Sequence, residues 1–391
     1  GRLLLEPWPR PADGAASLLG HGCGVAVEFW EEGPDGQLYS PGRPPYSRAL
    51  PRGAATVTTT VHGLEVPTLP LMAGPTVHEC DFPVDVVYTW VDGDDPAWNA
   101  AREQRLAGAT DPTMRTQASS GRARFVDRGE LRYSMRGVHL FAPWVRRIHL
   151  VTAGQVPDWL DPDHPAIHLV DHAEILPPDA LPTFNSHAIE SAIHRIDGLS
   201  EHFLYLNDDF FLGRPLRPER FFSPAGGTAV FLSSTLVGLP DAASPAYLQA
   251  AENNRRLIQD AFGRTTVHTL QHAPYAHRVS VLREIAERFA AEVEATGRAA
   301  FRSATDVSML SSLAQHYGLA SGTAHVADAD VGFVDVTDPL LPRRLRDLAK
   351  RERELFCLGD SHSFARDPAR VAELVSGFLE TYFPIAAPWE R

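Results

Sequence analysis

At residues 203–212 the chain reads Phe-Leu-Tyr-Leu-Asn-Asp-Asp-Phe-Phe-Leu. Asp208 and Asp209, preceded by the amide of Asn207, lie between two apolar runs, where a buried strand would ordinarily end in a turn. Because burial of two unpaired carboxylates is costly, such a pair normally faces cations. At the end of a central α/β strand, an aspartate pair typically holds a divalent metal that binds phosphate oxygens. The alternative is an acidic turn that caps a helix.

From Val84 onward the chain alternates between strand-like and helix-like stretches. β-branched and aromatic content predicts strands over residues 84–91, 147–152, 166–170 and 202–206. Apolar periodicity predicts intervening helices, notably over residues 130–141 and 186–196. This order predicts an α/β fold whose mostly parallel sheet carries helices on both faces. Ligands of such sheets bind beyond the carboxyl ends of the strands, where Asp92, Thr152 and Asp208 are expected.

Two other parts of the chain differ from this pattern. In residues 1–80, short β-type runs alternate with Pro/Gly turns, which predicts a small β-rich N-terminal appendage. Residues 222–355 are predicted to form a helical insertion or lid over the sheet. Its expected helices cover residues 244–262, 279–296, 306–317 and 340–355. The remaining domain is therefore expected to span residues 81–391, closed by a last helix at Pro368–Tyr382.

Composition excludes several classes of protein. The chain has 391 residues, of which 44% are apolar and 22% charged, as in ordinary globular proteins. A formal net charge of −13 argues against a broad nucleic-acid-binding surface. The segment 1–9 is too short and polar for the core of a signal peptide, and no run approaches the roughly 18 apolar residues of a membrane span. We expect a cytoplasmic protein that neither binds nucleic acid nor spans a membrane.

The three cysteines, Cys23, Cys80 and Cys357, lie far apart and lack C-x-x-C spacing. They form neither a disulfide framework nor a thiolate zinc site by themselves. Free thiols in a reducing cytosol are favoured, with one disulfide as the alternative.

The stretch 85–98 ends a predicted strand in an acidic turn and contains Trp90 and Asp92. The apolar face of Trp90 suits stacking on a base or sugar, and Asp92 suits hydrogen bonds from a ribose or sugar hydroxyl. The alternative is a core aromatic residue followed by a surface turn.

A basic pair, Arg132 and Arg136, lies four residues apart near the start of a predicted helix and so shares one face. Two guanidinium groups at such a position suit a diphosphate. The alternative is a solvated basic face paired with Glu130.

Histidines occur in two further places. After Asn185, the chain places His187, Glu190 and His194 at positions i, i+3 and i+7. This spacing matches no H-E-x-x-H metalloprotease motif, so substrate contacts are favoured over a zinc site. The C-terminal half adds three stretches that are atypical of helix interiors. These are 271–275 with His272, 302–306 with Arg302, and 357–361 with Asp360. A lone histidine is more often structural or exposed than functional.

Together these segments resemble the Stealth family of sugar-phosphate transferases, which includes bacterial capsular-polysaccharide hexose-phosphate transferases and the catalytic subunit of N-acetylglucosamine-1-phosphotransferase. The resemblance covers roughly Val84 to Asp360 in four blocks. The blocks are Asp85–Pro96, Arg124–Phe222, His272 to about Tyr317, and Phe356–Asp360. One residue departs from the family pattern, since Gly359 stands where the family usually has Asn. If that Asn binds metal or substrate, this chain lacks one contact.

The resemblance implies that the sheet binds a nucleotide-diphosphate sugar, which donates its whole sugar-1-phosphate to a hydroxyl of a glycan or sugar acceptor. A nucleoside monophosphate leaves. UDP-N-acetylglucosamine is the favoured donor, and the product would serve a bacterial capsule or other cell-surface glycan. Two alternatives are a metal-dependent glycosyltransferase that releases a nucleoside diphosphate and a non-catalytic nucleotide-sugar-binding protein.

This reaction assigns roles to the candidate residues. Metal ions and arginines would neutralise the transferring phosphoryl group, and a His or Asp would take the acceptor proton. Mg²⁺ or Mn²⁺ would be held by Asp208, Asp209 and Asp360. The diphosphate would be bound by Arg132, Arg136 and Arg302. The candidates for the general base, in order, are His272, His187 and, if it is not a metal ligand, Asp209. Further substrate contacts would come from Trp90, Asp92, Asn185, Glu190 and Asn207.

Overall fold

The computed structural model describes residues 2–7, 19–20, 23–42, 47–61, 63–109, 111–239, 244–360 and 367–391, with the backbone alone at 117, 118, 122 and 123. The chain divides into two compact units, Gly1–Asp81 and Phe82–Arg391.

The N-terminal unit is built from short antiparallel strands. They are β1 (Arg2–Leu5), β2 (Val25–Glu28), β3 (Glu31–Glu32), β4 (Gln37–Tyr39), β5 (Ala49–Pro51), β6 (Val57–Val61) and β7 (Leu64–Thr68). Strand β1 pairs with β2, β4 lies between β3 and β5, and β6 forms a hairpin with β7. The predicted β-rich character of this part of the chain is confirmed.

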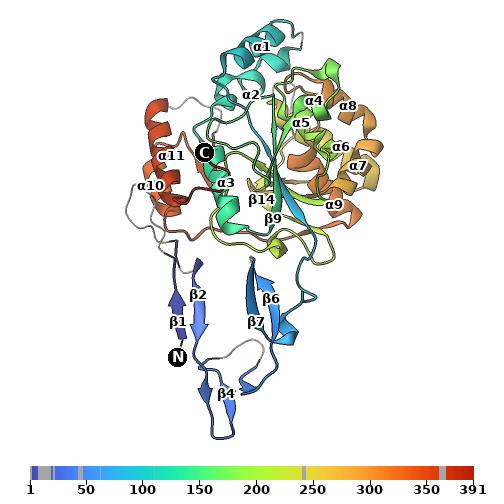
Figure 1. Ribbon diagram of the computed structural model, residues 1–391. Coiled ribbons are helices and arrows are strands. Elements are labelled where there is room, and N and C mark those ends of the chain that lie inside the picture. The colour runs from blue at the N-terminus through green and yellow to red at the C-terminus, as the bar shows by residue number, and fades with distance from the viewer. Residues whose placement is uncertain are drawn as a thin grey trace. The chain divides into compact units, whose positions relative to one another are not determined.

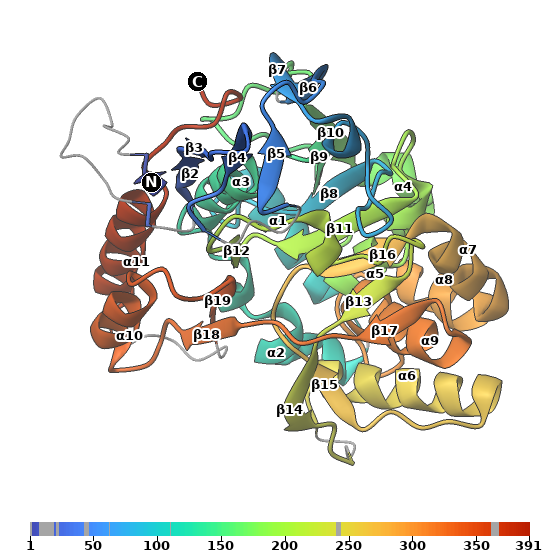
Figure 2. The same ribbon diagram turned by 90° about the horizontal axis from the view of Figure 1, so that it is seen from below.

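The second unit combines a central sheet with many helices (Figure 1). The sheet has five strands in the order β10-β9-β8-β11-β16, which can be followed in Figure 2. Its strands are β8 (Val84–Thr89), β9 (Val145–Thr152), β10 (Ile167–Asp171), β11 (His202–Asn207) and β16 (Tyr275–Arg278). The first four run parallel, and β16 is antiparallel to β11. The predicted mostly parallel sheet is confirmed. Asn207 pairs with Thr89, so the acidic pair that follows β11 lies at the same sheet edge as the turn that follows β8.

Helices cover both faces of this sheet, because the strand side chains alternate between two apolar environments. One face contributes Val87, Val151 and Phe203 to a core shared with several helices. On the other face Tyr88 contacts Ser134 of α3 (Glu130–Phe141), with 2.7 Å between the two hydroxyl oxygens. Figure 2 shows α6–α9 on one side of the central sheet and α10 and α11 on the other.

The helices of this unit vary in length. They are α1 (Pro96–Ala107), α2 (Gln117–Ser120), α3, α4 (His172–Ile175), α5 (Ser186–Glu190), α6 (Ala246–Phe262), α7 (Val279–Arg288), α8 (Ala290–Arg298), α9 (Ala314–Ser321), α10 (Leu341–Leu348) and α11 (Pro368–Tyr382). A π-helical turn, Met309–Leu313, precedes α9. None of the helices that the structure describes is both long and apolar enough to cross a membrane.

A second sheet, β12-β19-β18, continues directly from the acidic pair. Its strands are β12 (Phe210–Leu212), β18 (Val331–Asp335) and β19 (Leu355–Gly359). On one face of it, Phe211 and Phe356 stack 4.9 Å apart and pack against Phe383 beyond α11. Phe210 and Phe333 pair with the same β19 residue, Cys357, and belong to the opposite face.

Residues 222–355 supply strands as well as helices. Besides β16 and β18, they contain β13 (Thr228–Val230), β14 (Leu232–Leu236), β15 (His268–Leu270) and β17 (Ala324–Val326). The single helix expected over 279–296 is wrong, because the backbone leaves helical geometry at Phe289 (φ −116°, ψ 40°) and separates α7 from α8. The helix expected over 340–355 ends at Leu348, and Leu355 already begins β19.

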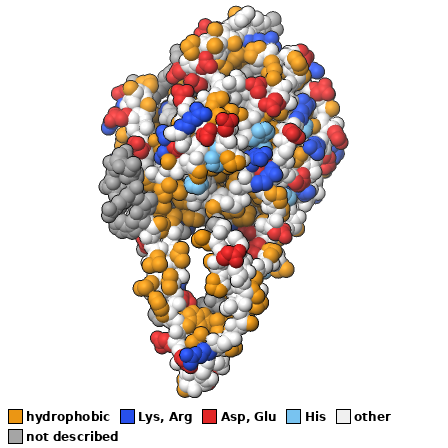
Figure 3. All heavy atoms as spheres, in the orientation of Figure 1, with side chains coloured by type: hydrophobic (Ala, Val, Ile, Leu, Met, Phe, Trp, Pro, Cys, Tyr) orange, Lys and Arg blue, Asp and Glu red, His pale blue; other side chains and the backbone are white. Residues whose placement is uncertain are grey.

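The surface drawn in Figure 3 carries both signs of charge. Acidic and basic side chains of the described residues are intermixed on that face, and histidines lie among them. Neither sign of charge dominates it.

Candidate active site

The acidic pair forms the connection between β11 and β12. The carbonyl oxygen of Asp209 accepts a hydrogen bond from the Leu358 amide (3.1 Å), which places the end of β19 and the following Asp360 beside the pair. The Cys357 thiol donates to Asp209 Oδ2 (3.5 Å). Asp209 Oδ1 is buried and has no hydrogen-bond partner in the part of the chain that the structure describes. The backbone segments that carry Asp209 and Asp360 therefore lie next to each other, and the role of Asp208, Asp209 and Asp360 as metal ligands stays a prediction.

The start of α3 supplies further charged groups to this site. The Arg128 guanidinium donates to Asp360 Oδ2 (3.0 Å), and its backbone N–H donates to Glu130 Oε2 (2.6 Å). Glu130 is buried, and Asp127 accepts hydrogen bonds from the Gly129 amide and from Trp90 Nε1. Sequence reasoning gave no role to Arg128, although it lies within the family-like block.

Negative charge is in excess here. Burial raises the pKa of Asp208 well above its usual range, and the neighbouring Asp209, Glu130 and Asp127 carboxylates raise it further. Burial, followed by the charge of Glu130, raises the pKa of Asp209 to about 7. Only one guanidinium, that of Arg128, is paired with this group of carboxylates among the described contacts. Such an arrangement fits a bound cation, because a cation would relieve both the desolvation and the mutual repulsion.

The structure does not, however, enclose a metal ion with protein ligands alone. Within the described ranges, no three His, Cys, Asp or Glu side chains lie close enough together to hold one. The fit to a metal therefore rests on the charge of Asp208 and Asp209 and on the unpartnered Asp209 Oδ1. A metal there would need additional ligands from substrate or water.

The turn after β8 closes one side of the site. Trp90 is largely buried and its indole N–H donates to Asp127 Oδ2 (2.9 Å). Asp92 is partly exposed, and Gln155 bridges its backbone N–H and C=O. A Cβ at Gly93 would lie 1.8 Å from the Phe125 carbonyl oxygen, so only glycine lets the segment bearing Arg124 approach this turn. The roles of Trp90 and Asp92 in nucleotide binding stay predictions, as does that of the partly exposed Asn207 at the end of β11.

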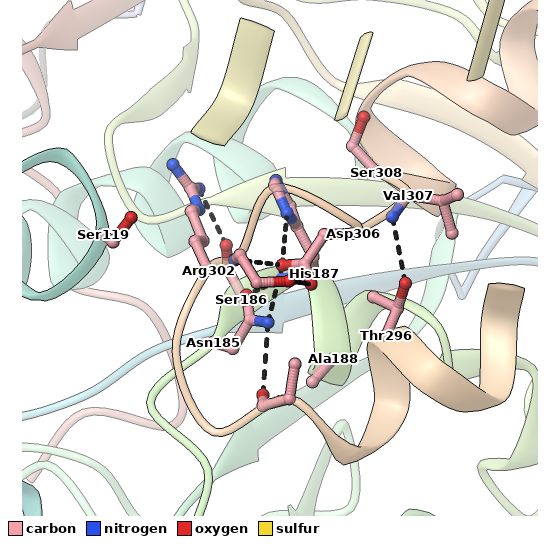
Figure 4. A network of polar contacts seen from close by, with 12 residues as sticks. Ser119, Asn185, Ser186, His187, Ala188, Thr296, Arg302, Asp306, Val307 and Ser308 are labelled. Atoms are coloured by element: carbon pink, nitrogen blue, oxygen red, sulfur yellow. Dashed lines mark hydrogen bonds and ion pairs between the residues drawn. The ribbon is translucent and has the colours of Figure 1, made fainter. Parts of the chain in front are cut away.

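A second polar network lies at the N-terminus of α5 and centres on Asp306, a fully buried carboxylate (Figure 4). Asp306 Oδ2 accepts hydrogen bonds from Asn185 Nδ2 (2.8 Å) and from the Ser303 amide (3.1 Å), and lies 3.2 Å from His187 Nδ1. Its Oδ1 accepts from the Ser303 hydroxyl (2.7 Å). Asn185 caps α5, since its side-chain oxygen accepts from the His187 amide. The sequence pointed to the stretch 302–306 but did not indicate that Asp306 is the common hydrogen-bond acceptor of this network.

The buried position of His187 in this network disfavours its charged form. Burial and the charge of Arg302 both lower its pKa, and Asp306 only partly offsets them. With a carboxylate at Nδ1, the Nδ1–H is the donor and Nε2 carries the lone pair. Glu190, further along α5, accepts hydrogen bonds from the Leu310 and Ser311 amides and from the Ser311 hydroxyl. It thereby ties α5 to the π-helical turn.

Arg302 lies next to this network and is under-partnered. Its Nη2 donates to the Ser186 hydroxyl (2.8 Å), whereas its Nε is buried without a hydrogen-bond partner among the described residues. Burial lowers the pKa of Arg302, and burial plus the charge of Arg302 lower that of Arg124 well below its usual range. Arg302 also interacts electrostatically with Tyr205 of β11. Two desolvated guanidinium groups near the end of β11 suit an anionic ligand.

His272 lies in the segment before β16 and is exposed. Its ring centroid lies 6.1 Å from that of Phe210 and 5.1 Å from that of Phe333. Desolvation by these surroundings lowers its pKa. Phe210 immediately follows Asp209 in the chain, so His272 packs against a direct neighbour of the acidic pair.

Arg132 and Arg136, the predicted diphosphate ligands, have a different partner. Both donate to the buried Glu390 carboxylate, at distances of 2.6–2.7 Å, and Arg136 also donates to the Phe383 carbonyl oxygen (2.8 Å). These contacts tie α3 to the C-terminal segment. Both guanidinium groups thus form ion pairs with Glu390. Binding of a diphosphate by Arg132 and Arg136 stays a prediction.

Models of the four conserved regions of Stealth proteins match this chain. Region 1 matches residues 82–109, region 2 residues 124–230, region 3 residues 271–319 and region 4 residues 346–391. The chain belongs to the Stealth family. The blocks on which the predicted resemblance rested lie inside these regions, so the resemblance is confirmed.

Relatives within the Stealth family are similar over nearly the whole chain. Exopolysaccharide phosphotransferase SCO6023 of Streptomyces coelicolor is 42% identical over 402 residues, which cover 98% of this chain and 67% of that protein. SCO2592 of the same organism, also an exopolysaccharide phosphotransferase, is 43% identical, with 95% of this chain and 40% of its own length covered. For exopolysaccharide phosphotransferase CpsY of Mycobacterium tuberculosis the identity is 41%, and the coverage is 95% and 70%. This chain thus spans between 40% and 70% of the length of these three relatives.

Among solved structures, the galactosyltransferase LgtC, in complex with donor and acceptor sugar analogs, aligns with 75% of this chain and 95% of its own. The sequence identity is 13% and the TM-score is 0.37.

Proposed function

We propose that this chain transfers a hexose-1-phosphate from a nucleotide-diphosphate sugar to a hydroxyl of a glycan acceptor. The acceptor oxygen forms a bond to the sugar-bearing phosphorus, the bond from that phosphorus to the oxygen bridging the two phosphates breaks, and a nucleoside monophosphate leaves. The acceptor hydroxyl loses its proton to a base, and the product is a phosphodiester. Membership of the Stealth family and the names of its exopolysaccharide phosphotransferase relatives support this proposal.

The observation that carries the proposal is the combination of two desolvated groups of opposite charge next to the end of β11. Asp208 and Asp209 form a carboxylate pair with raised pKa values, and Arg302 is a guanidinium with a lowered pKa and a buried Nε that lacks a partner. Phosphoryl transfer needs such groups, because charge spreads over the phosphoryl oxygens in the transition state.

Mg²⁺ or Mn²⁺ fits the acidic side of this site. Asp208 and Asp209 would hold it, and Asp360 would join them if Arg128 released its carboxylate. When bound, the metal would neutralise phosphate oxygens of the donor. Arg302, with Arg124 beside it, would bind the phosphate oxygens from the other side.

Two histidines compete for the role of general base. His272 is exposed and can be reached by an acceptor from solvent, whereas His187 is buried and is fixed by Asp306. We therefore keep His272 as the base and assign His187 to the positioning of Arg302 and of the donor. The order of the two candidates is open to a direct test by substitution.

The remaining contacts would select the donor. Contacts to the nucleotide and sugar would come from Trp90, Asp92, Asn185, Glu190 and Asn207, with UDP-N-acetylglucosamine as the favoured donor. Because bacteria make nucleotide sugars in the cytoplasm, we expect the reaction to take place there.

The test is a mass-spectrometric assay of the purified chain with Mg²⁺ or Mn²⁺ and a panel of UDP-, GDP- and CMP-sugars. Parallel reactions contain EDTA. UDP-N-acetylglucosamine is tried first, with water and simple methyl glycosides as acceptors. Metal-dependent release of UMP together with a sugar-phosphate product is the expected result.

Two other results would overturn the proposal. Release of UDP with a transferred or free sugar would indicate an ordinary glycosyltransferase, since a different bond of the donor is broken. Tight binding of nucleotide sugars without turnover across all acceptors would indicate a binding protein.

A further inference from the structure

Phe333 exposes a large aromatic surface beside the candidate active site. Its side chain is 53% exposed, although the next residue of β18, Val334, is buried, as expected for alternating faces of a strand. The ring centroids of Phe333 and His272 lie 5.1 Å apart, with their planes inclined by 52°. Ligand sites are commonly lined by aromatic rings, so an exposed phenylalanine next to a candidate catalytic histidine is a candidate ligand contact.

The Phe333 ring also occupies the space above Gly359. A Cβ at position 359 would lie 2.6 Å from Cε2 and 3.0 Å from Cζ of that ring. A side chain at 359 could therefore fit only if the Phe333 ring swung away. Gly359 departs from the Asn of the family pattern, and Asp360, which follows it, keeps its carboxylate. In this chain the Phe333 ring thus occupies the space that a side chain at 359 would need.

We propose that Phe333 forms the platform on which the acceptor sugar packs, and that the glycine at position 359 is what allows the ring to lie there. This inference rests on the proposed function and on His272 as the base. The acceptor hydroxyl must come within hydrogen-bond reach of the base, so the sugar that carries it lies over the neighbouring ring. A hexose presents C–H groups on one face, which pack on an aromatic ring while its hydroxyls remain available for hydrogen bonds.

The donor is a weaker match for this ring. Phosphate groups of the donor would be bound by the metal and by Arg302, whereas the Phe333 ring packs beside His272. The platform therefore distinguishes acceptors by the shape of their apolar face. Acceptors with axial hydroxyls on that face would pack less well.

The experiment compares Phe333→Ala and Phe333→Trp with the unmodified chain, using saturating UDP-N-acetylglucosamine and a series of methyl glycosides with gluco, galacto and manno configuration. Phe333→Ala should raise the acceptor KM about five- to tenfold, the worth of one aromatic contact, with kcat and the donor KM changed less than twofold. Phe333→Trp should retain the acceptor KM. Tyr247→Ala removes another exposed aromatic residue, on α6, and should change nothing.

Gly359→Asn provides a second, independent perturbation. It should raise the acceptor KM by displacing the ring, and the double variant with Phe333→Ala should be no worse than the poorer single variant, because both remove the same contact. An activity-independent measurement is saturation-transfer NMR of the same methyl glycosides. The C–H protons of one sugar face should receive saturation in the unmodified chain and much less in Phe333→Ala.

The outcomes separate this inference from the proposed function. If the unmodified chain releases a nucleoside monophosphate but Phe333→Ala leaves the acceptor KM and the NMR signal unchanged, the platform is refuted and the function stands. A rise in the donor KM alone would refute the assignment to the acceptor. If no donor is turned over, the proposed function fails, whereas loss of the NMR signal in Phe333→Ala would still establish the sugar platform.

Discussion

Substitution of Asp306 offers the sharpest test of the network at the start of α5. Asp306→Ala removes a fully buried carboxylate that accepts hydrogen bonds from Asn185, from His187 and twice from Ser303. The donors are left in a protein interior, where each unsatisfied group costs about 1–3 kcal/mol. Because removal of the carboxylate also removes its own desolvation penalty, we expect a net loss of about 3–5 kcal/mol in the free energy of unfolding.

The assay is equilibrium unfolding in urea followed by near-UV circular dichroism. Asp306→Asn keeps the volume and one acceptor oxygen, so its loss should be smaller, about 2 kcal/mol. Asp260→Ala, which removes an exposed carboxylate on α6, serves as the matched control and should stay within about 0.5 kcal/mol of the unmodified chain.

An unchanged unfolding free energy would contradict the reasoning. If Asp306→Ala lay within about 1 kcal/mol of the unmodified chain, with the same denaturant dependence, the network would not organise α5 as its hydrogen bonds indicate. Reduced turnover without reduced stability would instead give Asp306 a role confined to orienting His187.

Three further predictions concern other parts of the second unit. Asp209→Asn and Asp208→Asn should each lower metal-dependent turnover at least about 100-fold, and full turnover in both would disprove the predicted metal ligands. Glu390→Ala should lower the free energy of unfolding, measured in urea, by about 3 kcal/mol, because it leaves the Arg136 guanidinium buried without its carboxylate partner. An unchanged donor KM in Arg136→Ala would disprove the predicted contact between Arg136 and the diphosphate. Burial lowers the pKa of His316 from 6.5 to about 4. Between pH 6.5 and 4 the imidazole is therefore protonated in the unfolded chain but neutral in the folded chain, and the free energy of unfolding falls as the pH drops through this range. At pH 5 this protonation difference lowers the free energy of unfolding by about 2 kcal/mol. In His316→Asn the drop in unfolding free energy from pH 7.5 to pH 5 should therefore be about 2 kcal/mol smaller than in the unmodified chain.

The features that the sequence determined by itself are those set by neighbouring residues. The predicted helix over 130–141 coincides with α3, because its apolar periodicity extends over a whole helix. The acidic pair could be placed at the end of β11, since an apolar run and the two carboxylates adjoin in the chain. The Stealth blocks are likewise contiguous segments, so the family could be recognised without a structure.

The tertiary structure alone decided which charged groups meet. Asp306 contacts His187 across 119 residues of chain, and Arg136 contacts Glu390 across 254. Two arginines on one helix face predict an anion, but only the fold determines whether that anion is a substrate phosphate or a distant carboxylate of the same chain. Similarly, the space above Gly359 belongs to Phe333 of another strand. The spacing of residues along the chain fixes the local backbone, whereas desolvation and pairing of charges depend on three-dimensional proximity, which local sequence does not encode.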